Sequence, residues 1–328
     1  MPIHHATLHQ LKIFDAVARH MSFARAAEEL HLTPPALSIQ VKQLSEAIGQ
    51  PLFEQIGKKI SLTAVGDASW AACRDVLNRL EQLTHELAAL QGLEKGSLKL
   101  ATLATAKYFI PRLLGDFCTK HLGIDTTLFM GNREAVLERL ARNQDDLYIL
   151  GQPPEHMNVV TEPFADNLLV VVSSPSQPLV QEKDIDPARL QDVPFILREP
   201  GSGTRLAAEK FFEQYGVVLK ARMELGSNEA VKQVVAGGLG MAVLSASTLR
   251  AELASGELAI LDVRGFPLKR KWYAVYPAGK QLTPATRAFM EYLFATAPAS
   301  ALVHLLDQPQ SHAVAAAAGR KRRQSSSG

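Results

Sequence analysis

Apolar residues near the start of the chain recur at helical spacing in three short runs, and a residue that favours helix N-termini precedes each run. These caps are Thr7, Ser22 and Thr33, and Pro34 and Pro35 follow the last of them in a first turn that tolerates proline. The apolar positions are Leu8, Leu11, Phe14 and Val17, then Phe23, Ala26, Ala27 and Leu30, then Leu37, Val41, Leu44 and Ile48. Two helices joined by a short turn and packed on a third form the scaffold that places a recognition helix in the DNA major groove.

The third predicted helix turns a mixed polar and apolar face outward when its leucine stripe faces the core. The outward positions are Pro35, Ser38, Ile39 and Lys42. Ser38 suits a base edge or a phosphate, Lys42 suits a phosphate, and the two apolar residues suit thymine methyl groups. Residues 55–62 predict a hairpin with Lys58 and Lys59 at its tip, placed to follow the DNA backbone or enter an A·T-rich minor groove. The predicted DNA-binding residues are Ser22, Thr33, Pro34, Pro35, Ser38, Ile39, Lys42, Lys58 and Lys59.

A long helix is expected next, because residues 63–91 hold no proline and only one glycine, Gly66. An apolar seam follows this segment at spacings of three and four residues: Cys73, Val76, Leu80, Leu83, Leu87 and Leu90. The heptad pattern predicts a dimerisation helix, and the alternative is a helix that packs on its own domain. Dimerisation would present two recognition helices to the two half-sites of a near-palindromic operator. Gly92 and Gly96 predict a hinge into the next domain.

From residue 97 the pattern changes to strands that alternate with helices. Strands are expected at 97–103, 125–130, 146–150, 168–173, 195–197, 220–224, 240–244 and 271–276, and helices at 107–121, 134–143, 204–215, 228–236 and 284–294. This order predicts a mostly parallel sheet with helices on both faces, divided into two α/β lobes that are joined by crossing strands. Such lobes enclose a cleft at the carboxyl ends of strands, where small ligands bind.

Three loops are expected to line this cleft with groups that suit an anion. They are the segments Ala104 to Lys107, Gly131 to Arg133, and Glu199 to Arg205. Glycines ahead of a helix, beside Ser, Thr and Arg, form a nest for phosphate or carboxylate, although the same motif also occurs as an ordinary capped turn. The predicted effector-binding residues are Thr105, Ala106, Lys107, Asn132, Arg133, Glu199, Gly201, Ser202, Gly203, Thr204, Arg205, Ser227 and Asn228.

Composition narrows the function classes. The 328 residues, 47% of them hydrophobic and 21% charged, suffice for two or three globular domains. We expect a cytoplasmic protein with no membrane partner, because there is no long apolar run and no signal-peptide core. Cys73 and Cys118 fit a reducing compartment and provide no cysteine metal site. No hydrolase elbow, Walker loop, zinc-protease motif or dinucleotide fingerprint occurs, so we expect no enzyme, no catalytic residue, no metal and no cofactor.

The first 62 residues also carry motifs of a known family. The motifs are Ser22-Phe23-x-x-Ala26-Ala27-x-x-Leu30-x-x-Thr33, Pro35-Ala36-Leu37-Ser38-x-Gln40-Val41-Lys42-x-Leu44 and Leu52-Phe53-Glu54. This arrangement resembles the N-terminus of LysR-type transcriptional regulators. The resemblance implies a fold that joins an all-α winged helix-turn-helix, a long linker helix and a two-lobed α/β effector domain of the type 2 periplasmic-binding-protein kind. Two positions depart from the family pattern, since Pro34 replaces a Gln that often reads bases and Val65 replaces a commoner Ala.

The later segments are similar to the CbbR branch of that family, the activators of RuBisCO operons. The similar segments are 105–109, 131–134, 151–154, 162–167 and 198–205. The resemblance implies control of carbon-fixation genes, most simply as an activator that contacts RNA polymerase from a promoter operator in double-stranded DNA. It also implies a homodimer or homotetramer and a small anionic co-inducer of the phosphorylated-sugar, phosphoenolpyruvate or NADPH class. Regulation of another metabolic operon, and a small-molecule-binding protein without a DNA role, remain as alternatives.

The predicted organisation is therefore a DNA-binding domain at 1–62, a linker and dimerisation helix at 63–92, an effector domain at 93–298 and a tail at 299–328. We expect the tail to be disordered, because its alanines and the basic run at 320–323 offer little apolar surface to bury. The net charge of +2 is too small for a broad electrostatic footprint, so DNA binding has to rest on a local surface. Basic and acidic residues nearly balance within residues 1–62, and a module that binds only protein is the alternative for that domain.

Overall fold

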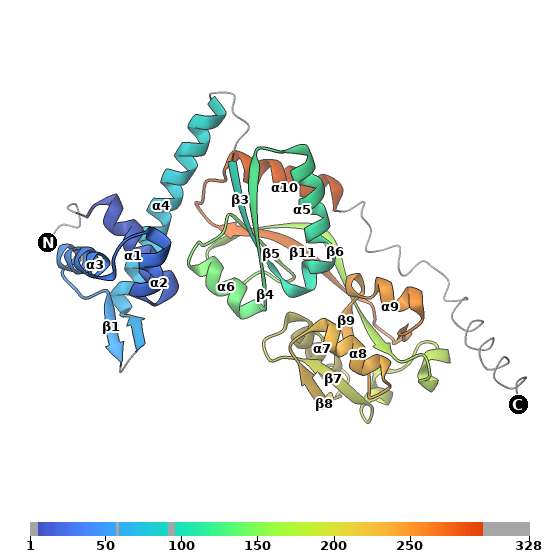
Figure 1. Ribbon diagram of the computed structural model, residues 1–328. Coiled ribbons are helices and arrows are strands. Elements are labelled where there is room, and N and C mark those ends of the chain that lie inside the picture. Colours follow the sequence, from blue (N-terminus) through green and yellow to red (C-terminus); the bar gives the residue numbers. More distant parts are fainter. Residues whose placement is uncertain (1–5, 57–58, 91–95, 298–328) are drawn as a thin grey trace, which may run out of the picture.

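The computed structural model describes residues 6–56, 59–90 and 96–297 (Figure 1). The N-terminal domain consists of α1 (Leu8–His20), α2 (Phe23–Leu30), α3 (Pro34–Ile48) and a hairpin of β1 (Phe53–Ile56) and β2 (Lys59–Leu62). The stripes seen in the sequence meet in its core, where Phe14, Leu37 and Leu44 are fully buried. Thr7 caps α1 in a reciprocal capping box with Gln10, and Ser22 accepts a hydrogen bond from the Arg25 amide. Local sequence therefore accounts for the first two helix starts.

Helix α4 (Ala64–Leu90) leaves this domain as a single rod of 27 residues, about 40 Å long at the usual helical rise (Figure 1). Its first turns pack on α1, where the Trp70 ring and the Cys73 side chain are buried with Phe14 and Leu44. The remainder of the helix projects from the domain. Helix α4 thus begins as part of the N-terminal core and continues beyond it, where residues of the effector domain contact it.

The first lobe of the C-terminal domain is built on three parallel strands, with β3 (Gly96–Leu103) between β4 (Ile124–Gly131) and β5 (Leu147–Leu150). Helices α5 (Ile110–Lys120) and α10 (Pro284–Thr296) cover one face of the sheet, and α6 (Arg133–Ala141) covers the other. A short 3₁₀ helix, η2 (Ala104–Tyr108), connects β3 to α5. Strands β3 and β4 therefore both end next to helix starts, at the same edge of the sheet.

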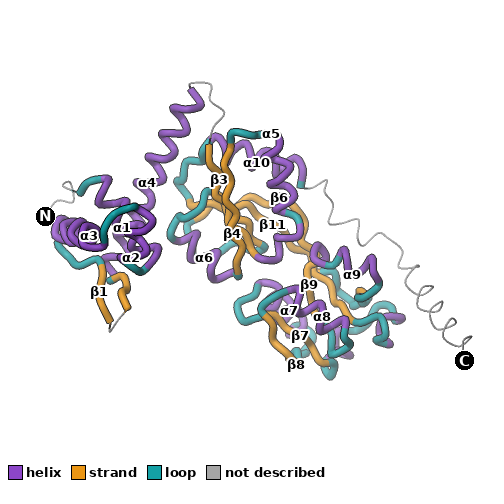
Figure 2. The backbone as a smooth tube through the Cα atoms, viewed as in Figure 1, coloured by secondary structure: helices purple, strands orange, loops and turns teal. Residues whose placement is uncertain are grey.

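Two long antiparallel strands, β6 (Val159–Ser173) and β11 (Leu268–Pro277), run from the first lobe into the second (Figure 2). The second lobe adds β7 (Pro194–Arg198), β8 (Lys220–Leu225), β9 (Ala242–Ser245) and β10 (Ala259–Ile260), with α7 (Gly203–Glu213), α8 (Asn228–Ala236) and α9 (Arg250–Ser255). Short 3₁₀ turns lie at η3 (Pro178–Gln181), η4 (Pro187–Leu190) and η5 (Ala246–Thr248). Helix α7 packs on one face of this lobe and α8 on the other.

The fold class predicted from the sequence is confirmed. The short strand β10 was not predicted, and the other strands differ from the prediction in two respects. The large sheet has the order β10-β6-β11-β5-β3-β4, with β9 beside β6, and it is mixed instead of mostly parallel, because β11 is antiparallel to both β5 and β6. Strand β6 begins at Val159 and not at residue 168. Pro163 and its charged neighbours hide this first half, and the pairing with β11 shifts register beside Pro163, where a proline is tolerated.

Within the described residues, no helix is long and apolar enough to cross a membrane.

Candidate nucleic-acid interface and anion-binding cleft

The outward face of α3 presents the predicted recognition residues to solvent. Pro34, Pro35, Ser38 and Lys42 are exposed, and Ile39 is 55% exposed although it is apolar. The opposite face, with Leu37, Val41 and Leu44, is buried, so the outward face is the one that can meet a partner through these residues. An exposed isoleucine beside a serine and a lysine fits contact with thymine methyl groups, base edges and phosphates.

The start of α3 differs from the prediction in one detail. Thr33 occupies the N-cap position with extended backbone angles, but its side chain makes no capping hydrogen bond. Pro34 and Pro35 fill the first two helical positions and carry no amide hydrogen there. The amide of the third position, Ala36, is the first from which the hydroxyl could accept, and it forms no such bond with Thr33. The hydroxyl of the exposed Thr33 is therefore left for another partner. Ser22 does cap α2, and its hydroxyl proton remains available to a phosphate.

The hairpin next to α3 carries Lys59 on its exposed side at the start of β2. The register Phe53↔Leu62 to Ile56↔Lys59 places Lys59 at the end of the ladder farthest from the helices. Lys58, the second predicted hairpin contact, lies outside the described residues. Lys59 thus provides one exposed positive charge at the hairpin end.

The predicted seam on α4 is only partly free. Val76, Leu80, Leu83 and Leu87 are exposed, with Leu83 at 46% and Leu87 at 51%. Cys73 does not belong to this stripe, because it is 3% exposed, packs against α1 and donates to the Leu11 carbonyl at 3.3 Å. The side chain of Leu90 is outside what the structure describes. The sequence pattern predicts one continuous seam. In the structure its first position, Cys73, lies in the core of the N-terminal domain, and the next four positions form an exposed apolar stripe.

A cleft opens between the two lobes, beside the crossing strands β6 and β11. It holds about 470 Å³ of empty space, part of which is open to solvent. The cleft is lined by Leu103, Ala104, Thr105, Gly131, Asn132, Arg133, Gly151, Gln152, Asn167, Arg198, Glu199, Ser202, Gly203, Thr204, Arg270 and Trp272. Three arginines and one carboxylate on this lining leave a net charge of +2 on the cleft wall. That charge favours a small anion.

Two helices begin at the cleft and direct their amino ends towards it. Asn132 caps α6 by accepting from the Ala135 amide at 2.9 Å, and Arg133 is the first residue of that helix. Ser202 precedes α7 and makes no side-chain capping bond, so the first amides of α7 have no side-chain acceptor from it. Unpaired helix-terminal amides and the helix dipole both favour negative charge at this place.

Arg133 and Arg270 face the cleft without an ion pair among the described residues. Arg133 donates to the Gln152 carbonyl at 2.8 Å, and Arg270 donates to the carbonyls of Gly203 at 2.7 Å and Gly151 at 3.0 Å. Burial lowers the pKa of Arg133, and burial together with the nearby Arg133 charge lowers the pKa of Arg270. Two desolvated guanidinium groups that repel one another are stabilised when an anion enters between them.

The third arginine of the cleft is already neutralised. Arg198, which is 6% exposed, forms a double ion pair with Glu199, with Nε to Oε2 at 2.7 Å and Nη2 to Oε1 at 2.8 Å. Its remaining nitrogen donates to the Asn228 side chain. Arg198 therefore shapes the cleft wall, and Glu199, a predicted effector ligand, is its counterion.

Several other predicted effector residues lie elsewhere. Ala106 is fully buried in the core of the first lobe, Gly201 is not part of the lining, and Ser227 caps α8 by accepting from the Ala230 amide. Arg205 was predicted to bind the anion, but it points to Glu209 at 2.7 Å and Glu224 at 2.9 Å. Sequence reasoning did not include the second partner, because Glu224 comes from β8, which is remote in sequence.

Lys107 and Asn228 connect the lobes instead of lining the cleft. Lys107 Nζ lies 2.5 Å from Glu229 Oε1, Tyr108 donates to the same carboxylate, and Asn228 Nδ2 donates to Thr105 Oγ1 at 3.3 Å. Burial disfavours the charged form of Glu229, but hydrogen bonds from Lys107 and Tyr108 outweigh it and hold its pKa at about 2. The positive charge of Lys107, which we predicted to bind the effector, therefore forms an ion pair between η2 and α8.

The lining residues that sequence reasoning missed come mainly from the crossing strands and the end of β5. They are Leu103, Gly151, Gln152, Asn167, Arg198, Arg270 and Trp272. Arg270 carried no local signal, since it lies in a charged run of β11 without a glycine or a cap beside it. Trp272 adds a polar group that sequence did not indicate, because its Nε1 is buried without a hydrogen-bond partner in the described part of the chain. An acceptor oxygen or a water would satisfy it.

Comparison with known proteins finds a family match for the N-terminal domain and another for the C-terminal domain. The profile of the bacterial regulatory helix-turn-helix protein, lysR family, matches residues 8–67, and that of the LysR substrate binding domain matches residues 91–298. The RuBisCO operon transcriptional regulator of Acidithiobacillus ferrooxidans is 80% identical over 295 residues, which are 90% of this chain and 96% of the relative. The transcriptional activator CmpR of Synechocystis is 51% identical over 290 residues, covering 88% and 95%.

A solved structure resembles the C-terminal domain. The CcmR regulatory domain of Synechocystis PCC6803, in complex with 2-PG, is 49% identical with a TM-score of 0.60. The match covers 62% of this chain and 98% of that domain.

Proposed function

Because this chain belongs to the LysR family of bacterial transcriptional regulators, we propose that it controls carbon-fixation genes in response to a small anion bound between its lobes. Membership of the family makes it a regulator that binds double-stranded DNA and carries an effector-binding domain, and not an enzyme. The alternative of a small-molecule-binding protein without a DNA role is set aside by the helix-turn-helix match over residues 8–67.

One observation carries the proposal for the effector. Arg133 and Arg270 converge on the cleft without an ion pair among the described residues, beside the amino ends of α6 and α7. Few metabolites satisfy two guanidinium groups at once, and those that do carry phosphate or carboxylate groups. The relative whose regulatory domain was solved with 2-PG supports a small anion of this kind.

The DNA-binding and oligomeric parts of the proposal rest on exposed residues. We assign contact with the operator to Ser38, Ile39 and Lys42 on α3 and to Lys59 on the hairpin, since all four side chains are exposed to solvent. We assign self-association to the stripe of Val76, Leu80, Leu83 and Leu87, because an apolar row of this length is stable in water when a second copy covers it. The dimer would act as an activator by holding RNA polymerase at the promoter.

The experiment is a calorimetric titration of the full-length protein with 2-PG, ribulose bisphosphate, phosphoenolpyruvate and NADPH, followed by a mobility-shift assay with each ligand. Saturable binding of one anion, together with a change in affinity for DNA upstream of a carbon-fixation operon, is the expected result. Binding of DNA without a response to any of the four anions would leave a LysR-type regulator of another metabolic operon. Binding of an anion with no affinity for that DNA would contradict the assigned regulon.

A further inference from the structure

Helix α6 joins the anion-binding cleft to the linker helix. Its first residue, Arg133, lines the cleft, and its last turn ends at Ala141. Nine residues make a rod of roughly 13 Å, and α6 lies on the side of the effector domain that faces the N-terminal domain (Figure 1). The segment 142–146, which connects α6 to β5 and is called the corner below, follows directly.

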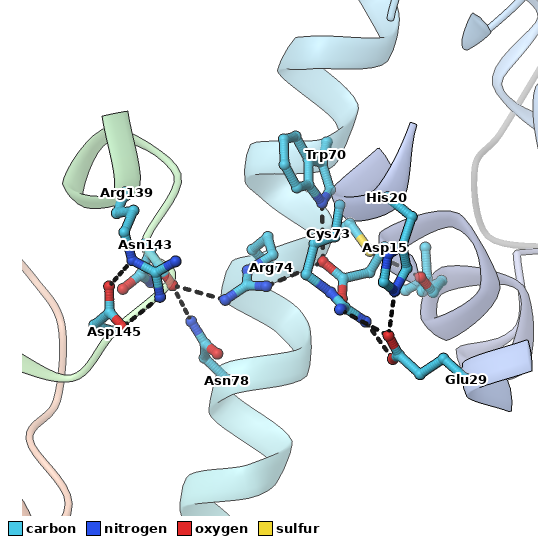
Figure 3. Close-up of polar contacts among 12 residues, drawn as sticks. Asp15, His20, Glu29, Trp70, Cys73, Arg74, Asn78, Arg139, Asn143 and Asp145 are labelled. Atoms are coloured by element: carbon cyan, nitrogen blue, oxygen red, sulfur yellow. Dashed lines mark hydrogen bonds and ion pairs between the residues drawn. The ribbon is translucent and has the colours of Figure 1, made fainter. Parts of the chain in front are cut away.

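The corner contacts one face of α4. The Asn143 carbonyl accepts from Asn78 Nδ2 at 2.8 Å and from Arg74 Nη2 at 3.5 Å (Figure 3). Asn143 Nδ2 also donates to Asp75 Oδ1 at 2.8 Å. One residue earlier, the Arg142 guanidinium lies 4.7 Å from the centre of the Trp70 ring. Residues 70, 74 and 78 succeed one another at intervals of four, so they share a face of the helix. The corner thus contacts α4 along two turns, and this set of contacts is called the grip below.

Hydrogen bonds and ion pairs within the effector domain fix the position of the corner. Lys280 Nζ donates to Asn143 Oδ1 at 2.8 Å and to the Asp145 carbonyl at 2.6 Å. Arg139 forms a double ion pair with Asp145, with oxygens at 2.8 and 2.6 Å, and Asp145 is only 2% exposed. Because Arg139 lies on α6 itself, a displacement of that helix carries the corner with it.

Trp70 and Arg74 of α4 also contact the helix-turn-helix domain formed by α1, α2 and α3, which is called the reading head below. Trp70 Nε1 donates to Asp15 Oδ1 at 2.9 Å, and Arg74 Nη1 lies 3.2 Å from the same oxygen of α1 (Figure 3). The other oxygen of Asp15 accepts from Arg19, which forms an ion pair with Glu29 on α2. Trp70 and Arg74 are therefore clamped between the effector domain on one side and the helix-turn-helix on the other.

We propose that the grip of the corner on α4 is the contact through which the state of the cleft reaches the reading head of the same chain. An anion bound to Arg133 acts on the first residue of α6, and the corner at the other end transmits the displacement to Trp70 and Arg74. The inference rests on the proposed sensing function. It requires that the anion favours one arrangement of corner and linker over another, since a ligand without that preference shifts nothing.

The test uses full-length protein with Asp75→Ala and Asn78→Ala, singly and together, because these side chains touch the corner and lie far along the chain from the cleft residues. Thr84→Ala is the matched control on the same helix, since its exposed hydroxyl donates to the Leu80 carbonyl of α4 itself. The first readout is the factor by which 2-PG changes operator affinity. We expect the double variant to reduce that factor roughly fivefold or more, with 2-PG affinity in the absence of DNA unchanged. An unreduced factor would overturn the transmission.

A second readout needs no ligand. Amide hydrogen exchange at residues 140–146 in the unliganded protein should rise roughly fivefold in the double variant and stay at the wild-type rate in Thr84→Ala. Equal protection in all three proteins would overturn the grip itself. If 2-PG, ribulose bisphosphate, phosphoenolpyruvate and NADPH all leave wild-type operator affinity unchanged, the sensing function and the transmission both fail, whereas the exchange rates still decide whether the grip exists.

Discussion

Replacing one of the two unpaired cleft arginines should separate ligand binding from stability. In Arg133→Gln the helix start and its Asn132 cap remain, and glutamine still offers a donor towards the Gln152 carbonyl. What disappears is a positive charge that faces the cleft and that adds to the effect of burial in lowering the pKa of Arg270. The variant should therefore bind an anion more weakly while its unliganded form is as stable as the wild type or slightly more stable.

The size of the effect follows from the interaction that is lost. A hydrogen bond to a charged group contributes roughly 1.5–3 kcal/mol, which weakens anion binding about 10- to 150-fold. At a ligand concentration of about 100 times the wild-type Kd, the wild type gains about 2.7 kcal/mol, and a variant weakened 100-fold gains about 0.4 kcal/mol. For a domain of this size the shifts in Tm are then roughly 5–10 °C for the wild type and about 1 °C for the variant.

The assay is thermal unfolding with and without 2-PG, combined with calorimetric titration. The matched control is Arg112→Gln, which removes an exposed arginine at the start of α5 and is expected to behave as the wild type. If Arg133→Gln binds 2-PG within about threefold of the wild type, the cleft arginines do not hold the anion, because the loss of a charge-assisted hydrogen bond would exceed that value. A lower Tm of the unliganded variant would contradict the repulsion between the two arginines.

Three further predictions concern other parts of the chain. Lys42→Glu should weaken operator binding about tenfold and lower the salt dependence of that binding by about one ion, with 2-PG affinity unchanged. Mobility-shift assays at several salt concentrations measure this, and an unchanged operator affinity would show that Lys42 does not contact DNA. Leu83→Asp should convert the oligomer to monomers in sedimentation without loss of monomer stability, since Leu83 is 46% exposed, and a persistent dimer would exclude this stripe as the seam. The hydrogen bond from Arg19 holds the pKa of Glu29 at about 2, below its ordinary 4.5, so its stabilisation is present above pH 4.5 and is lost as the pH falls towards 2. Because Glu29 is partly exposed, Glu29→Gln should cost about 1 kcal/mol or less in urea unfolding at pH 7 and nothing near pH 2, and a pH-independent difference would refute this.

Local pattern was sufficient for the N-terminal domain. The stripe of Leu37, Val41 and Leu44 predicts both the helix and its buried face, because periodicity within one helix decides which side meets the core. The same reasoning failed at Cys73, since a heptad position does not reveal whether the partner is a second chain or α1 of the same chain. It also failed at Thr33, which occupies the N-cap position but accepts no hydrogen bond from a helix amide through its side chain.

The cleft was predicted in outline and only partly in its residues. Loops that end strands and begin helices, such as Asn132–Arg133 and Ser202–Thr204, are recognisable from the sequence and do line it. Arg270 was missed because it enters the cleft from a strand that comes from much later in the chain. The ion pair of Lys107 was not foreseen either, because its partner Glu229 belongs to the other lobe. Pairings between distant segments decide which charges remain free, and no local pattern encodes them.

The central claim is that an anion in the cleft changes how the reading heads contact DNA. The most direct test is a footprint of the purified protein on the DNA upstream of its own gene and the divergent neighbour, with and without 2-PG, ribulose bisphosphate, phosphoenolpyruvate and NADPH. The account predicts specific protection whose extent, or whose hypersensitive sites at bent DNA, change with one of these anions and do not change in Arg133→Gln. Protection that is the same with and without every anion would contradict the claim.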